Sequence, residues 1–180
     1  MKTYIAFLRG INVSGQKKIK MADLRASLRK QGLENVRTYI QSGNIIFETL
    51  NAKTRELEIT MEKAIKLDFG FEVPVLIRTP QEIQDILNEN PFGGETDIKG
   101  LYFALLHKTP LDELATTFQQ LKFENDDFHY TSDCVYLNCK MGAGKAKLTN
   151  NLIESKLKVT TTTRNLNTMK KMIALAQDQR

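Results

Sequence analysis

The sequence is poor in the residues on which redox and metal chemistry depend. It has two cysteines, two histidines and no tryptophan. Cys134 and Cys139 lie at an odd spacing on one predicted strand, so their side chains point to opposite faces and a disulfide between them is not expected. No CxxC pair is present, and His107 and His129 fall on different predicted elements. We therefore expect neither a metal site nor a cofactor.

Long hydrophobic runs are also missing from the sequence. No apolar stretch approaches the roughly 18 residues that a membrane-spanning helix requires. The apolar stretch before Arg9 is too short for a secretory signal and is typical of a first strand. Two free thiols suit a reducing compartment, so we expect a cytoplasmic protein that does not enter a membrane.

Acidic residues are scarce at both ends of the chain. Residues 1–37 carry a formal charge of +7, residues 38–139 a charge of −9 and residues 140–180 a charge of +7. If the fold brings the two ends together, they form a positive face that attracts phosphate groups. If it does not, they are two separate solvated faces. Charge counting alone does not separate these two interpretations.

Hydrophobic periodicity predicts the same order of elements twice. Each half gives strand, helix, strand, strand, helix, strand and one further helix. Apolar residues every four positions indicate an amphipathic helix over 54–69, and Ser42–Gly43 and Ser132–Asp133 mark tight hairpin turns. Thr79 and Glu82 form the pattern of a capped helix start.

We interpret this repetition as the duplication of a split βαβ unit. The predicted fold class is α+β, with two tandem ferredoxin-like units whose antiparallel sheets carry packed helices. The predicted divisions are a first unit over residues 1–90, a linker over 91–100 that is rich in proline, glycine and acid, and a second unit over 101–180.

An unusually long connection follows the first predicted strand, in LRGINVSGQKKIKM. Connections between a strand and a helix usually have about 2–6 residues, and longer ordered ones are often functional. The two glycines would let the backbone approach a ligand, and the start of the following helix favours an anion. Arg9, Lys17 and Lys18 would add positive charge, and Asn12 an amide. The alternative is a mobile basic loop without a ligand.

Two further stretches place polar groups at turns. Asn44 flanks the turn in YIQSGN, although turn chemistry alone also explains that stretch. Arg164 and Asn165 stand where the last strand meets the last helix, where Asn165 would cap the helix and Arg164 would bind a carboxylate or phosphate. NCKMGAGKAKLT is not a P-loop, because Ala146 stands where a magnesium-binding hydroxyl is needed.

LRGINVSGQKKIKM, VRTYIQSGNIIFE and TTRNLNTMKK together resemble the hallmark stretches of the bacterial DUF1697 family, a domain of unknown function. The resemblance runs from about the first strand to about the last helix. Leu166 stands where the family usually has tryptophan, so an aromatic ligand contact there would be lost, whereas a core position would tolerate leucine. The resemblance implies a bacterial cytosolic protein with an α+β fold, and it implies no activity.

These observations favour a protein that binds a small anionic ligand bearing a phosphate or carboxylate group. The predicted ligand contacts are Arg9, Asn12, Lys17, Lys18, Asn44, Arg164 and Asn165. Binding of single-stranded nucleic acid along the basic ends is the alternative. An enzyme with its site in the same loops is a third hypothesis, for which the sequence indicates no catalytic residue.

Overall fold

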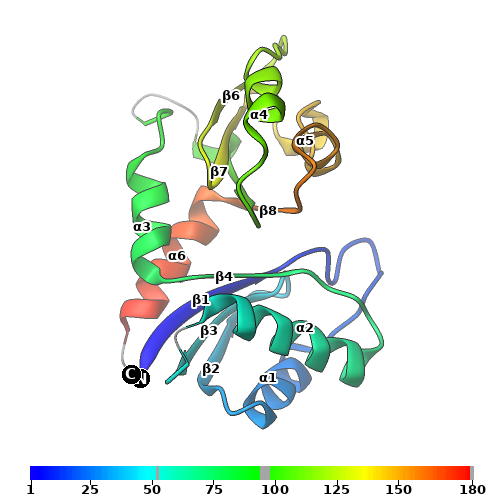
Figure 1. Ribbon diagram of the computed structural model, residues 1–180, viewed down its shortest axis with the longest axis vertical. Coiled ribbons are helices and arrows are strands. Elements are labelled where there is room, and N and C mark those ends of the chain that lie inside the picture. Colours follow the sequence, from blue (N-terminus) through cyan, green and yellow to red (C-terminus); the bar gives the residue numbers. More distant parts are fainter. Residues whose placement is uncertain (52, 94–97, 179–180) are drawn as a thin grey trace. The chain divides into compact units, whose positions relative to one another are not determined.

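The computed structural model describes residues 1–51, 53–93 and 98–178, and its elements follow the predicted order twice (Figure 1). The first half contains β1 (Lys2–Leu8), α1 (Met21–Lys30), β2 (Glu34–Tyr39), β3 (Asn44–Thr49), α2 (Thr54–Phe69), β4 (Val75–Arg78) and α3 (Pro80–Asn88). The second contains η1 (Ile98–Gly100), β5 (Leu101–Leu106), α4 (Asp112–Gln119), β6 (Asp126–Tyr130), β7 (Cys134–Cys139), η2 (Ala143–Lys145), α5 (Asn150–Leu157), β8 (Thr161–Asn165) and α6 (Leu166–Gln177). No helix within the described ranges is long and apolar enough to span a membrane.

The strands form two four-stranded antiparallel sheets, ordered β2-β3-β1-β4 and β6-β7-β5-β8. The prediction of an α+β fold with two antiparallel sheets and packed helices is confirmed. The pairing of β1 with β4 also begins at a position that corresponds to the start of the pairing of β5 with β8. Leu8 lies opposite Val75 in the first, and Leu106 lies opposite Thr161 in the second.

The chain divides into two compact units. The first comprises Met1–Gln84 together with the residues from Lys171 onward, and the second comprises Asp85–Lys170. Within the first unit, Arg37 of β2 donates hydrogen bonds to the carbonyls of Leu175 (2.8 Å) and Asp178 (3.1 Å) at the end of α6. Part of the predicted linker, residues 94–97, lies outside the described residues, so the predicted divisions remain a prediction.

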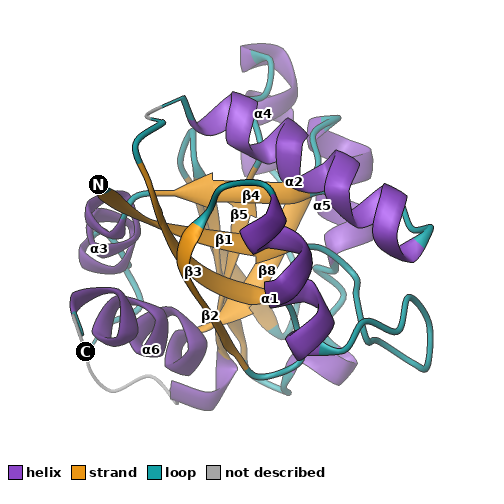
Figure 2. Ribbon diagram, turned by 90° about the horizontal axis from the view of Figure 1, so that it is seen from below, coloured by secondary structure: helices purple, strands orange, loops and turns teal. Residues whose placement is uncertain are grey.

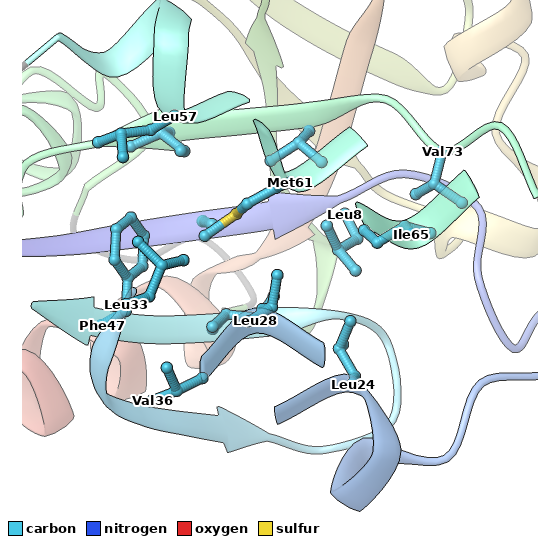
Figure 3. Packing of buried hydrophobic residues seen from close by; sticks show 14 of the residues in the cluster. Leu8, Leu24, Leu28, Leu33, Val36, Phe47, Leu57, Met61, Ile65 and Val73 are labelled. Carbon is cyan, nitrogen blue, oxygen red and sulfur yellow. The ribbon is translucent and has the colours of Figure 1, made fainter. Parts of the chain in front are cut away.

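The core of the first unit lies between its sheet and the helices α1 and α2, which occupy one side of that sheet (Figures 1 and 2). Leu24 and Leu28 of α1 and Met61 of α2 are fully buried there (Figure 3). They pack against β1 and β3, whose inward residues include Leu8 and Phe47. The amphipathic period of α2 therefore serves burial against the sheet, as the sequence predicts.

The second unit has a core of its own. Val135 and Leu137 of β7 pack with Ile153 of α5 and Phe118 of α4. Phe118 also contacts the half-buried Phe128 of β6, with 4.9 Å between ring centroids. The helices α4 and α5 thus cover one face of the second sheet.

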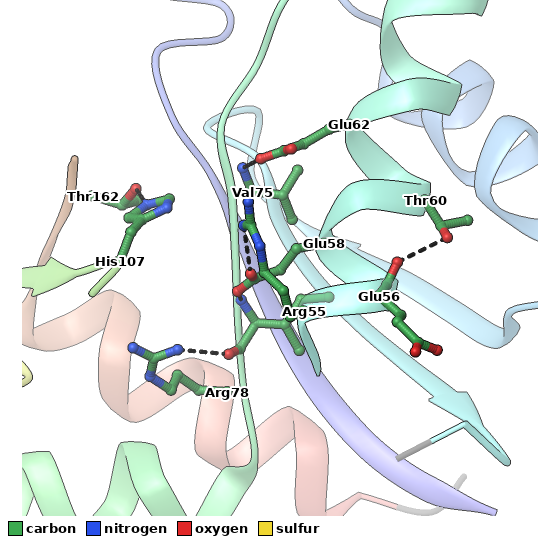
Figure 4. A network of polar contacts seen from close by, with 10 residues as sticks. Arg55, Glu56, Glu58, Thr60, Glu62, Val75, Arg78, His107 and Thr162 are labelled. Atoms are coloured by element: carbon green, nitrogen blue, oxygen red, sulfur yellow. Dashed lines mark hydrogen bonds and ion pairs between the residues drawn. The ribbon is translucent and has the colours of Figure 1, made fainter. Parts of the chain in front are cut away.

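A helix closes the outer edge of the first sheet at β4. Glu62 Oε1 accepts a hydrogen bond from the Val75 N–H (3.1 Å) and Glu58 Oε1 accepts one from the Ile77 N–H (3.0 Å), both along α2 (Figure 4). These residues alternate along β4, so their N–H groups leave the strand on the same side. The carboxylates therefore occupy donors that would otherwise be open to another strand.

The outer edge of the second sheet is closed at β8 by α5 in the same way. Glu154 Oε1 accepts a hydrogen bond from the Thr161 N–H at 2.7 Å. Asn150, one helical turn earlier, accepts hydrogen bonds from the hydroxyls of Thr161 and Thr163. Corresponding helices thus protect corresponding edges in the two units.

Candidate functional site

The opening loop, residues 9–20, folds into a small hairpin of its own. The Asn12 N–H donates to the Lys17 carbonyl at 3.2 Å, and the Gln16 N–H donates to the Val13 carbonyl at 2.9 Å. Ser14 and Gly15, between them, have φ values of +49° and +76°, as a type I′ turn requires. The long predicted connection is therefore an ordered structure built on left-handed backbone positions.

Asn12 holds this hairpin closed and joins it to the neighbouring turn. Its Oδ1 accepts a hydrogen bond from the Ile19 N–H at 2.9 Å, and its Nδ2 donates to the Ile19 carbonyl at 3.0 Å. Nδ2 also donates to the carbonyl of Gln41, between β2 and β3, at 2.8 Å. Both amide hydrogens of Asn12 are therefore used within the protein, which leaves only Oδ1 with spare acceptor capacity.

A pocket of about 630 Å³ opens between this loop and the start of α1. We call it the loop pocket; it is lined by Asn12, Gly15, Lys18, Ile19, Lys20, Met21, Asp23, Gln41 and Phe69. Lys18 and Lys20 are exposed, whereas Met21 and Phe69 are half-buried against the core. The lining therefore combines a cationic part with an apolar one.

The start of α1 contributes to the electrostatics of the loop pocket. Lys20 occupies the N-cap position, and no side chain caps the helix there. The first backbone N–H groups of a helix have no partner within it and give that end a partial positive charge. Asp23, in the first turn, offsets one of the two lysines, so the charged side chains of the lining sum to +1.

The other predicted contacts of the first unit lie outside the lining of the loop pocket. Lys17 Nζ donates to the carbonyl of Glu72 at 2.6 Å. Arg9 is half-buried, and its backbone N–H donates to the Pro74 carbonyl at 3.0 Å. The structure thus uses the backbone of Arg9 and the ammonium group of Lys17 to hold the loop against residues 72–74.

Asn44 and Asn165 both have structural partners. Asn44 is fully buried and donates to the Tyr39 carbonyl at 3.1 Å and to Ser42 Oγ at 2.9 Å, which fixes the hairpin turn. Asn165 Oδ1 accepts a hydrogen bond from the Thr168 N–H at 2.8 Å. The predicted capping of the last helix by Asn165 is therefore confirmed.

Arg164 lies in β8 and belongs to the second unit. Its Nη1 donates to the carbonyl of Thr163 at 2.9 Å. Burial lowers the pKa of the Arg164 guanidinium to about 10, which leaves it charged at neutral pH. Five of the seven predicted contacts thus belong to the first unit and two to the second, and a single site built from all seven remains a prediction.

Met21 and Phe69 are not among the ligand contacts predicted from the sequence. Both lie on the apolar faces of their helices, as the periodicity predicts. Each is nevertheless only half-buried, and one side of each lines the loop pocket. No local pattern distinguishes such a position from a fully buried one, because its exposure depends on where the opening loop folds.

The family model described as a protein of unknown function (DUF1697) matches residues 1–136. The chain belongs to the DUF1697 family. The matched residues include the entire lining of the loop pocket, whereas Arg164 and Asn165 lie beyond the match. The resemblance inferred from the sequence is confirmed.

One solved structure with which this DUF1697 chain can be compared is that of the conserved bacterial protein SP0830 from Streptococcus pneumoniae. The two sequences are 24% identical, and the similarity covers 97% of this chain and 98% of that one, with a TM-score of 0.74. This likeness shows a shared fold. None of the curated proteins compared with the sequence matches it.

Proposed function

We propose that this DUF1697 protein binds a small anionic ligand, bearing a phosphate or carboxylate group, in the loop pocket. The observation that carries the proposal is the lining itself, in which exposed Lys18 and Lys20 flank a helix start that no side chain caps. Backbone N–H groups at such a helix start are suited to an anion, and the two ammonium groups add to the attraction.

The apolar part of the loop pocket narrows the class of ligand. Ile19, Met21 and Phe69 form this part, and a volume of about 630 Å³ lies within the usual range of small-molecule sites. A ligand that joins an anionic group to an apolar or aromatic body would use both parts. In this proposal Asn12 shapes the site by fixing the opening loop to Gln41.

A small ligand fits the described residues better than a nucleic-acid strand. Proteins that stack bases on a sheet need exposed aromatic side chains on the strands. Among the described strands no phenylalanine or tyrosine side chain is fully exposed. Phe7, Phe103 and Tyr136 are each at most 1% exposed and Tyr4 is 2% exposed. The remaining strand tyrosines and Phe128 are half-buried; they are Tyr39, Tyr102, Phe128 and Tyr130. A cytoplasmic location agrees with a free small-molecule ligand and forms part of the proposal.

We also propose that each unit is a ferredoxin-like split βαβ unit and that the two arose by duplication. Both sheets have the same strand order, which supports this proposal. Arg78 and Arg164 occupy matching register positions, opposite Ile5 and Phe103. Each also donates from Nη1 to the carbonyl of the residue before it, at 2.9 Å. Figure 4 shows this contact for Arg78.

Titration of the protein with phenyl phosphate, followed by amide chemical shifts, tests the binding proposal. We expect the shifts to concentrate on Gly15, Met21 and Asp23. The double variant Lys18→Gln/Lys20→Gln should weaken binding about 10-fold or more, because hydrogen bonds to charged groups contribute strongly. Lys30→Gln is the matched control, since it removes an exposed lysine from the opposite end of α1.

Two results would contradict the proposal. One is the absence of shifts at the loop pocket at millimolar phenyl phosphate. The other is an equal loss of affinity in the double variant and in the Lys30→Gln control. A steep dependence of oligonucleotide affinity on salt, without phenyl phosphate binding, would instead support the nucleic-acid alternative.

A further inference from the structure

The outer edge of β6 differs from the other sheet edges. Two hydrogen bonds establish which residues of β6 direct their backbone groups toward β7. The Lys140 N–H donates to the Asn125 carbonyl (3.2 Å), and the Thr131 N–H donates to the Cys134 carbonyl (2.9 Å). Asp127 and His129 occupy every second position between Asn125 and Thr131, so they also direct their backbone groups to β7. The residues in between direct theirs outward; they are Asp126, Phe128 and Tyr130.

These outward groups are unpaired. In the described chain, no hydrogen bond reaches the backbone N–H or C=O of Asp126, Phe128 or Tyr130. By contrast, α2 covers β4 and α5 covers β8, as described above. The edge strand β2 is interrupted by a bulge after Glu34, and its Val36 carbonyl accepts a hydrogen bond from Arg29 at 3.2 Å. Unprotected edges are the positions at which sheets accept a further strand.

We propose that the outer edge of β6 is an interaction surface that pairs with β6 of a second copy of this chain. The two strands would run antiparallel about a two-fold axis at Phe128. In this register Asp126 of each copy lies opposite Tyr130 of the other, and the outward backbone groups of Asp126, Phe128 and Tyr130 are satisfied together. The two second-unit sheets would become one continuous sheet.

The side chains of β6 are self-complementary in this register. Asp127 lies directly opposite the partner subunit's His129, and the two-fold axis repeats the pair. Both residues are exposed in the single chain. They form a pair that is not hydrogen-bonded through the backbone, in which opposing side chains come closest. An imidazole N–H donates to a carboxylate in either protonation state of the histidine.

The existing partner of Asp127 leaves room for this contact. Lys140 Nζ lies 2.9 Å from Asp127 Oδ2 in an exposed ion pair. A carboxylate accepts several hydrogen bonds, so Oδ1 can take the imidazole N–H while Oδ2 keeps the lysine. A slip of the register by one residue would place Asp127 opposite Phe128 or Tyr130 of the partner subunit, so the charge pairs select one alignment.

The aromatic face of β6 also favours pairing with a second copy. Phe128 and Tyr130 are half-buried, and both contact Phe118 of α4, with ring centroids 4.9 Å and 6.4 Å apart. In the proposed register Phe128 faces the partner subunit's Phe128, with about 5.5 Å between Cα atoms. Pairing would therefore remove the remaining exposed part of this aromatic cluster from water.

Sedimentation of the intact protein over a range of concentrations tests this proposal. We expect a reversible dimer, and His129→Asp should raise its dissociation constant about 10-fold, because two attractive pairs become two repulsive ones. The double variant Asp127→His/His129→Asp exchanges the partners and should restore dimerisation. Thr116→Asp introduces the same acidic side chain at an exposed position of α4 and serves as the control.

Amide hydrogen exchange gives a second measurement. The N–H groups of Asp126, Phe128 and Tyr130 should become protected as the protein concentration rises, in step with dimer formation. A protein that stays monomeric at millimolar concentration overturns the proposal. A dimer whose dissociation constant is unchanged by His129→Asp also overturns the proposal, because such a dimer would use another surface. The pairing is also wrong if His129→Asp weakens dimerisation but the double variant Asp127→His/His129→Asp does not restore it.

Discussion

Replacement of Glu58 tests whether the helix carboxylates stabilise the sheet edge. Glu58 is 7% exposed, and its Oε1 accepts the hydrogen bond from the N–H of Ile77, which is fully buried. Glu58→Ala leaves that N–H without an acceptor. A buried polar group in this state costs about 1–3 kcal/mol. The lost pair with Arg55, at 3.1 Å, adds little because the arginine side chain is 71% exposed.

We therefore expect Glu58→Ala to lower the free energy of unfolding by about 2 kcal/mol. For a chain of this length, that corresponds to a fall in Tm of about 4–8 °C. Glu58→Gln keeps a carbonyl oxygen at the same position and should lose about half as much, since only the charge of the acceptor changes. Thermal unfolding followed by circular dichroism measures both.

Glu56→Ala is the matched control for this experiment. Glu56 lies two residues earlier on α2, and its exposed carboxylate forms an ion pair with Lys53 at 2.8 Å. It should leave Tm nearly unchanged, because exposed pairs are screened by solvent. Equal effects of Glu58→Ala and Glu56→Ala would refute the reasoning, since burial would then make no difference.

Two further pairs of substitutions test a turn and a helix cap by urea unfolding. Gly43→Ala should destabilise the protein by about 2–4 kcal/mol, because φ is +75° and the new Cβ would lie 2.5 Å from Leu8 Cβ. Gly70→Ala, at the same φ but in open space, should cost only about 1 kcal/mol; similar values for both would exclude the clash as the cause. Asn165→Ala should cost about 1 kcal/mol by removing the cap of α6, whereas Asn165→Asp keeps an acceptor and should cost less. No difference between these two variants would show that the cap does not contribute.

The order of elements could be predicted from local patterns, and their ends only in part. The helix predicted over 54–69 coincides with α2, because four turns of regular periodicity leave little ambiguity. The β-branched residues of Val159–Thr163 predict the last strand over that range, but β8 spans Thr161–Asn165. Its position is set by pairing with β5, at separations of 55 to 63 residues, which local composition does not encode.

The contacts of the candidate site are even less predictable from local sequence patterns than the ends of the strands. The length and charge of the opening loop are visible in the sequence, and residues of this loop line the loop pocket. The partners of its polar side chains are not visible there. Asn12 bonds to Gln41 and Lys17 to Glu72, at separations of 29 and 55 residues. Such contacts decide which side chains remain available to a ligand, and only the fold determines them.

The hydrogen bonds from Arg37 to the end of α6 have a consequence for synthesis of the chain. At about 5–20 residues per second, a ribosome needs about 4–17 s to proceed from Gln84 to Lys171. During that interval β1–β4 have already been synthesised, while the acceptor carbonyls of Leu175 and Asp178 do not yet exist. The first unit therefore lacks its C-terminal residues until synthesis of the second unit has finished. Ribosome pausing over the second unit would prolong the period in which a chaperone can bind the incomplete first unit.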